Sequence, residues 1–222
     1  MKIVIFLLGV GLIVGAYMLS DDAGMLNRGR DLIVDEVERE EEVEKKTDVE
    51  KEVVKDEILP IEGFDERISK KSFGDYISPA NSPVSPERFE GFHTGVDVEY
   101  EDGEDEVEVY AVADGEVVKS GWVSGYGGVV ILKSNLEGSD YYFLYGHLDP
   151  DSLHALGKLS KGEKLGVLGE GYTRESDGER KHLHFSVRKN SMSLKGYVQR
   201  ESELSDWVNP LSKELWQLLS EK

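Results

Sequence analysis

Short runs in which apolar and polar residues alternate characterise the sequence between residues 72 and 210. In residues 106–113, valine or alanine takes every second position, and Asp114-Gly115 follows as a turn signal. Alternation with a period of two is typical of strands with one buried face, and an Asp-Gly pair after such a run predicts a hairpin. Strands this short, with little helical periodicity between them, predict a mainly β fold with a small antiparallel sheet. Further strands are expected at residues 129–132, 141–148, 165–169 and 181–187.

A helical periodicity appears only near the C-terminus. Asn209-Pro210 is a typical helix start, with a capping side chain followed by proline in the first turn. Leucines at 211, 215, 218 and 219 then fall on one face of a helix. We therefore expect a short C-terminal helix over residues 211–222.

The N-terminus carries an uncharged, mostly apolar run from Ile3 to Leu19, which as a helix is long enough to span a bilayer core. Lys2 precedes this run and Asp21-Asp22 follows it, so the positive-inside tendency places the N-terminus in the cytoplasm and the remainder outside. We expect residues 1–20 to be a single-pass anchor in the cell membrane that leaves the rest of the chain extracytoplasmic. The alternative is a signal segment cleaved after Val14-Gly15-Ala16, which would give a secreted protein.

Charged residues set apart the segment 21–71. Within it, residues 34–55 are almost entirely Glu, Asp, Lys, Arg and Val. Such a composition buries too little apolar surface to fold alone, so we expect a charged linker that is disordered or partly helical. The alternative is a coiled coil with a thin valine seam. The folded domain is then predicted over residues 72–210.

Charge and cysteine content exclude several functions. The formal net charge of −19 at pH 7 repels phosphate backbones, so nucleic acid is not an expected partner. The 222 residues include no cysteine, which excludes disulfides, zinc sites built on thiolates and cysteine nucleophiles.

Four of the five histidines fall in three short patterns. These are His93-Thr94-Gly95-Val96-Asp97, Tyr145-Gly146-His147-Leu148 and His182-Leu183-His184. In a strand over residues 181–187, the two histidines of the third pattern share one face while the apolar residues between them face a core. In the strand 141–148, simple alternation puts His147 on the face of Tyr141, Phe143 and Tyr145.

These residues predict a metal site with groups for proton transfer. Catalytic zinc usually takes three protein ligands and leaves one position open, and four histidines with Asp97 give five candidates. Three would bind metal and two would act as acid and base, but their spacing does not decide which. The remaining histidine, His154, we interpret as an ordinary surface or core residue. The sequence contains neither His-Glu-x-x-His nor Gly-x-Ser-x-Gly, which excludes the zincin arrangement and that serine nucleophile turn.

Across about residues 72–190 the sequence resembles the M23 family of lysostaphin-like or LytM-type zinc endopeptidases, which cut peptidoglycan peptides. The blocks that carry the resemblance occur in the order found in that family. They are Phe92-His93-Thr94-Gly95-Val96-Asp97, Val109-Tyr110-Ala111-Val112-Ala113-Asp114-Gly115, Gly125-Tyr126-Gly127, Tyr145-Gly146-His147-Leu148, Lys161-Gly162 through Gly169, and His182-Leu183-His184-Phe185.

The resemblance sorts the five candidates. It implies that His93, Asp97 and His184 bind Zn²⁺ and that His147 and His182 assist catalysis. It also implies a LytM/lysostaphin-like β domain of the duplicated-hybrid-motif type, and a membrane-tethered endopeptidase in which metal-activated water attacks the scissile carbonyl of a peptidoglycan cross-link. The alternative is a non-catalytic LytM-like module that regulates or scaffolds another cell-wall hydrolase.

One segment departs from the pattern of the family. Relatives usually have a short Thr-Gly-Pro-like lead into His-x-His, whereas residues 174–181 of this chain form a longer, charged loop. We expect this loop to border the groove and to affect substrate preference more than zinc binding.

Overall fold

The computed structural model describes residues 58–101, 103 and 106–220. The chain divides into two units, Met1–Lys55 and Asp56–Lys222, and every described residue lies in the second unit. The anchor expected at residues 1–20 and most of the expected linker therefore lie outside the described residues. None of the helices in the described residues has the length and hydrophobicity of a membrane span.

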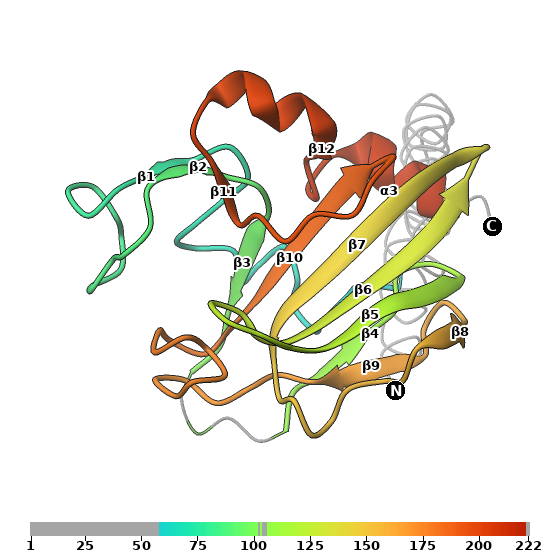
Figure 1. Cartoon of the computed structure of the whole chain (residues 1–222), viewed down its shortest axis with the longest axis horizontal. Helices are drawn as coiled ribbons and strands as arrows, with labels where there is room; N and C mark the ends of the chain where they lie inside the picture. The colour runs from blue at the N-terminus through green and yellow to red at the C-terminus, as the bar shows by residue number, and fades with distance from the viewer. Residues whose placement is uncertain (1–57, 102, 104–105, 221–222) are drawn as a thin grey trace, which may run out of the picture. The chain divides into compact units, whose positions relative to one another are not determined.

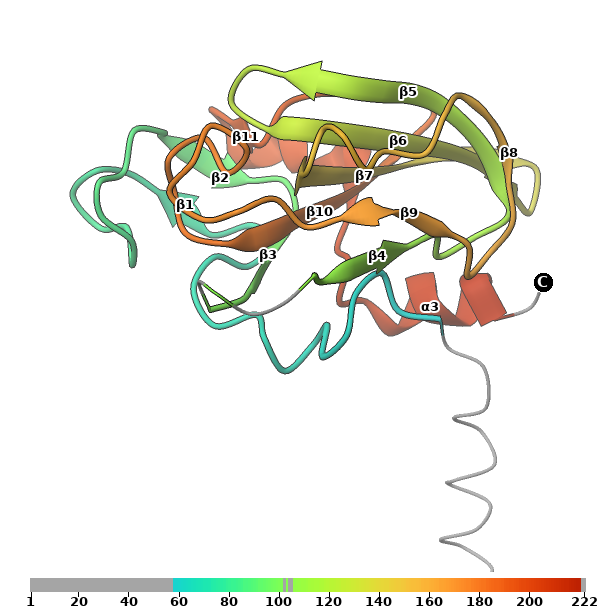
Figure 2. The ribbon, with the colours of Figure 1, turned by 90° about the horizontal axis from the view of Figure 1, so that it is seen from below.

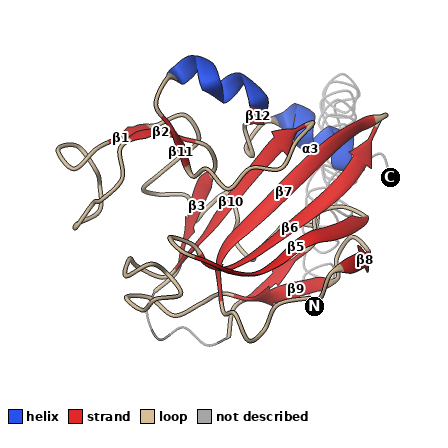
Figure 3. Cartoon of the chain, in the orientation of Figure 1, coloured by secondary structure: helices blue, strands red, loops and turns tan. Residues whose placement is uncertain are grey.

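Antiparallel strands make up most of the regular secondary structure in the described residues, as the alternating pattern predicts (Figure 3). Within the described residues, seven strands form the main sheet, and one of them, β3, is attached by pairing with β10 (Figure 1). Their order is β12 (Trp207–Val208), β10 (His182–Lys189), β7 (Ser139–Leu148), β6 (Gly127–Leu136), β5 (Gly115–Val123) and β8 (Gly157–Leu159), with β3 (Val96–Glu99) beside β10.

Two smaller sheets and two helical segments complete the described unit. A three-stranded sheet has the order β1 (Tyr76–Ile77), β2 (Gly91–His93) and β11 (Tyr197–Val198). A two-stranded sheet pairs β4 (Glu108–Tyr110) with β9 (Lys164–Val167). The 3₁₀ helix η1 spans Glu201–Asp206, and the α-helix α3 spans Lys213–Ser220.

The main core lies against one face of the large sheet. Phe143, Tyr145 and Phe185 of β7 and β10 are buried there with residues of β4, β9 and α3. Figure 2 shows β4 and α3 on the same side of the large sheet. The opposite face carries a smaller apolar cluster of Tyr126, Val129, Ile131 and Leu144, and the predicted site residues lie on that side.

The structure differs from two predicted local features. Asp114-Gly115 does not close a hairpin, because β4 pairs with β9 while β5 pairs with β6 and β8. The chain turns there, but it passes from one sheet to another. The C-terminal helix begins at Lys213 and not at residue 211, because the Asn209 side chain accepts a hydrogen bond from the Leu211 amide and forms a turn before the helix.

The segment that precedes residue 72 also differs from a solvated linker where it is described. Ile61 and Phe64 are buried in the main core. The Phe64 ring meets the rings of Phe185 and Trp216 edge-on, with centroids 5.6 Å apart in each case. Apolar residues at the end of the charged region therefore attach residues 58–71 to β10 and α3.

Candidate metal site and catalytic groove

A tight connection between two sheets places His93 and Asp97. His93 ends β2 in the three-stranded sheet, and Asp97 lies in β3, which pairs with β10 of the main sheet. Gly95 makes this close approach possible, since a Cβ at that position would lie 2.4 Å from the Phe185 carbonyl oxygen. The His-x-x-x-Asp pattern is thus presented by an extended segment and not by a helical turn.

Strand pairing brings the third member of the group beside them. His184 lies directly opposite Asp97 in the register between β10 and β3. Leu183 and Phe185 are buried in the main core, so His182 and His184 face the other side of the sheet, as predicted. Asp97 Oδ1 lies 3.3 Å from His93 Nε2 and 3.1 Å from His184 Nδ1, and the two nitrogens are 3.0 Å apart.

This geometry fits a metal ion. The three donor groups are buried, and their ligand atoms all lie within 4.8 Å of one another. Zinc with nitrogen and oxygen ligands at about 2.0–2.1 Å in a tetrahedron requires donor atoms roughly 3.3 Å apart, close to the distances between these atoms. Two imidazoles and one carboxylate are also a typical ligand set of catalytic zinc.

His147 reaches the same site through an irregularity in β7. The register between β6 and β7 shifts between Gly128 and Val130, and His147 has a φ of 63°. A bulge of this kind interrupts the alternation of side chains and redirects one of them. The prediction that His147 shares the face of Tyr145 is therefore wrong, since Tyr145 lies in the core while His147 stacks near His182 with ring centroids 4.3 Å apart.

Hydrogen bonds to backbone carbonyls fix the protons on three of the imidazoles. Nδ1 of His93, His147 and His182 faces the carbonyl oxygen of Ser72, Glu175 and Arg180, respectively. A carbonyl oxygen only accepts hydrogen bonds, so each Nδ1 carries the proton and each Nε2 presents a lone pair. His93 thus offers Nε2 to a metal, and His147 and His182 each offer Nε2 to a proton.

Burial controls the charge of these groups. Burial, with the nearby His184, lowers the pKa of His147 to about 3. Burial, with the nearby His147, also lowers the pKa of His182 well below its ordinary value. Both rings are therefore neutral at neutral pH and can act as bases. Burial alone would raise the pKa of Asp97, but His182 and His93 hold it well below its ordinary value, so its carboxylate stays ionised.

The group opens into a groove of about 360 Å³. Asp97, His147, His182 and His184 line it, and so do Ser176, Asp177 and Glu179. The charged loop 174–181 therefore borders the groove, as expected. Tyr126, from the Gly-Tyr-Gly block, also lines the groove and has its ring centroid 5.3 Å from that of His184 and 5.6 Å from that of His147.

The structure brings together all five residues chosen from the sequence. Asp97, His147, His182 and His184 line the groove, and His93 joins them through Asp97 and His184. His154 is not part of the groove lining. Sequence patterns missed the ionic groups that surround them. Arg180 donates to Asp97 Oδ2 at 2.9 Å, and Lys71 pairs with Glu87 and Glu179. The unusual charge of the loop before β10 drew attention to the region of Arg180. The spacing of residues in the sequence did not indicate that Arg180 would contact Asp97.

Two histidines and an aspartate that can share one ion, with two neutral imidazoles beside them in a β-sheet groove, define a metallohydrolase type of site. The sequence model of peptidase family M23 matches residues 91–195, the segment that supplies all five residues. Residues 91–195 therefore match peptidase family M23, a family of metallo-endopeptidases.

Several solved structures are similar to the chain. The catalytic domain of lysostaphin from Staphylococcus simulans has 24% identity and a TM-score of 0.45, over 68% of this chain and 94% of that domain. The LytU structure has 21% identity and a TM-score of 0.40, over 65% of this chain and 81% of LytU. Csd3 from Helicobacter pylori has 23% identity and a TM-score of 0.41, over 73% of this chain and 39% of Csd3. No curated protein sequence matches the chain.

Proposed function

We propose that this chain is a zinc endopeptidase that hydrolyses peptide cross-links of peptidoglycan, held at the outer side of the membrane by residues 1–20. The observation that carries the proposal is the convergence of His93, Asp97 and His184 on one point, with His147 and His182 beside it in the same groove. The match to family M23 supports the peptidase activity, and the uncharged run at residues 3–19 supports the anchor.

In this proposal Nε2 of His93, Oδ1 of Asp97 and Nδ1 of His184 hold Zn²⁺. Zinc bound there would lower the pKa of a water molecule and polarise the scissile carbonyl. The Ser72 carbonyl holds the ring of His93 in the required tautomer. The opposed positions of β3 and β10 fix Asp97 and His184 relative to each other.

His147 and His182 supply the proton transfers. One neutral Nε2 accepts the proton released when water attacks the scissile carbonyl and returns it to the leaving amine. The other ring, once protonated at Nε2, donates a hydrogen bond to the developing oxyanion. The burial that keeps both rings neutral before reaction also strengthens these interactions, because little water screens them.

Hydrolysis of purified peptidoglycan by the full-length protein in mild detergent tests the proposal. We expect release of peptide fragments detectable by mass spectrometry, and loss of this activity on treatment with a chelator. His184→Ala, which removes a proposed ligand, should reduce activity at least 10²-fold and lower the zinc content, whereas the control His154→Ala should leave both unchanged.

Full activity of the metal-free protein would refute the zinc mechanism. A zinc content near zero in the purified wild-type protein, with binding to peptidoglycan but no cleavage, would instead favour the non-catalytic regulatory module.

A further inference from the structure

Arg180 is a buried arginine that contacts a proposed metal ligand. It lies two residues before His182, and 6% of it is exposed. Its guanidinium contacts three carboxylates. The contacts are Nη2 to Asp97 Oδ2 at 2.9 Å, Nε and Nη2 to the two oxygens of Glu99 at 2.6 Å each, and Nη1 to Glu179 Oε2 at 2.7 Å.

The two carboxylate oxygens of Asp97 have different partners. Oδ1 faces His93 Nε2 and His184 Nδ1, while Oδ2 accepts the hydrogen bond from Arg180. The Asp97 amide also donates to the Lys71 carbonyl at 3.0 Å. A carboxylate held at its backbone and at its outer oxygen has little freedom to rotate, so Oδ1 stays directed at the metal position.

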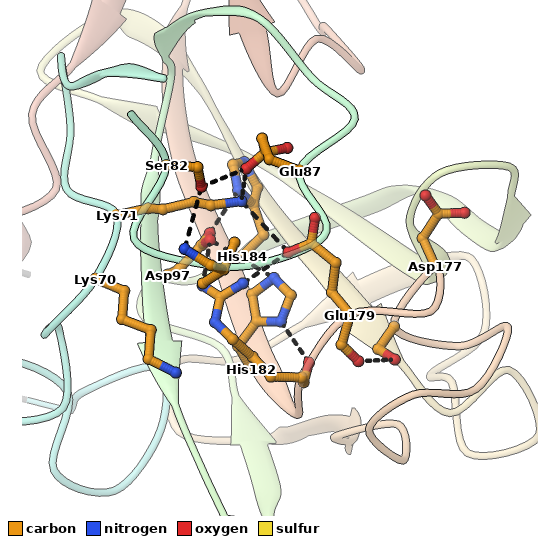
Figure 4. A network of polar contacts seen from close by, with 12 residues as sticks. Lys70, Lys71, Ser82, Glu87, Asp97, Asp177, Glu179, His182 and His184 are labelled. Atoms are coloured by element: carbon orange, nitrogen blue, oxygen red, sulfur yellow. Dashed lines mark hydrogen bonds and ion pairs between the residues drawn. The ribbon is translucent and has the colours of Figure 1, made fainter. Parts of the chain in front are cut away.

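Other ionic groups hold Arg180 in turn. Glu179 accepts from Lys71 Nζ at 3.3 Å, and Lys71 pairs with Glu87 at 2.8 Å. Figure 4 shows Lys71, Glu87 and Glu179 gathered beside Asp97 and His184. Lys71 and Glu87 have side chains that are 1% exposed, so this ionic cluster is part of the packed interior and not a solvated surface pair.

We propose that Arg180 is a positioning residue that orients the Asp97 carboxylate for metal binding. The proposal rests on the proposed zinc site. The planar guanidinium donates to three acceptors in fixed directions, which the single ammonium of lysine does not reproduce. Arg180 lies in the charged loop 174–181, which departs from the usual lead into His-x-His.

Two effects of Arg180 on zinc affinity oppose each other. As a positive charge near the site, it repels Zn²⁺, and its removal would tighten binding. As a partner of Oδ2, it orients a ligand, and loss of such outer contacts typically weakens metal binding 10–100-fold. The direction in which zinc affinity changes when Arg180 is substituted therefore distinguishes the two roles. Weaker binding indicates a positioning role, and tighter binding indicates a charge that only lies near the site.

The test is the affinity of the full-length metal-free protein for Zn²⁺ alone, measured by competition with a fluorescent chelator, in wild type and Arg180→Gln. We expect roughly 10–100-fold weaker binding, with an altered visible absorption spectrum of bound Co²⁺ because the ligand set is distorted. Arg180→Lys should recover part of the affinity. Arg188→Gln, in β10 and paired with Asp206, is the matched control and should bind as wild type does.

Circular dichroism identifies variants that fail to fold. Should Arg180→Gln not fold, the double variant Arg180→Gln/Glu99→Gln keeps the net charge of the site, and weak zinc binding by this folded variant is again the expected result. Zinc affinity equal to or tighter than wild type in either folded variant would overturn the positioning role. Absence of zinc binding by the wild-type protein would instead refute the proposed function on which the inference rests.

Discussion

The site depends on the close approach of a tyrosine ring to a glycine. Tyr126 packs on Gly146, where an added Cβ would lie 2.6 Å from Tyr126 Cδ1. The same ring contacts the imidazoles of His147 and His184. Gly146 lies directly opposite His184 in the register between β7 and β10, so any side chain there would displace the tyrosine from between the two histidines.

Gly146→Ala should therefore impair both activity and stability. We expect overpacking to cost about 1–3 kcal/mol of unfolding free energy and the displaced Tyr126 to reduce peptidoglycan hydrolysis at least tenfold. Thermal unfolding and hydrolysis rates measure the two effects. Gly166→Ala in β9, whose Cβ would meet the Ser152 hydroxyl at 3.0 Å, is the control, and an equal loss of activity there would contradict the role of Gly146.

His147 shows the limit of strand periodicity for a single residue. Alternation correctly placed Leu183 and Phe185 in the core and His182 and His184 outside it. It failed for His147 because one residue with a φ of 63° ends the alternation. A bulge is a property of the pairing between β7 and β6. The sequence of β7 alone therefore does not predict it.

Among the strands, those with strong local patterns were predictable, but their partners were not. The expected strands at residues 129–132, 141–148 and 165–169 correspond to β6, β7 and β9. The pairing of β4 with β9 joins residues more than fifty positions apart, and the alternating pattern is compatible with either that partner or the adjacent strand. The alternation of side chains along a strand determines which of its faces is buried. The packing of the whole domain determines which strand it pairs with.

The segment 58–71 also contributes to the core, and Phe64 tests how much. Phe64 is 0% exposed and contacts β10 and α3. Phe64→Ala should lower the unfolding free energy by about 3–5 kcal/mol. Leu156→Ala, at a position 66% exposed, should change it by less than about 0.5 kcal/mol. Denaturant titration measures both, and a loss below about 1 kcal/mol for Phe64→Ala would show that the segment is only loosely attached.

For the whole domain, the buried imidazoles make folding sensitive to acid. The pKa of His147 is lowered to about 3, whereas in the unfolded chain a histidine titrates near 6.5. Between these values the unfolded state binds the proton more strongly, so stability is lost as the pH falls below about 6.5. The lowered pKa values of His182 and Asp97 act in the same direction.

We therefore expect the metal-free protein to be less stable at pH 5 than at pH 7, with His147 alone contributing about 2 kcal/mol of the difference. Denaturant titrations at the two values measure it. His147→Gln should reduce the difference by about that amount, and His154→Gln should preserve it. Equal stability of the wild-type protein at both values would contradict the description of His147 as a buried neutral base.

The short connection from β2 to β3 has a consequence for the architecture as a whole. Its two ends belong to different sheets, and each end supplies one candidate ligand, His93 or Asp97. An ion bound by both residues, and by His184, would link the three-stranded sheet to the large sheet. Metal binding and the packing of the three-stranded sheet against the large sheet would then be thermodynamically coupled.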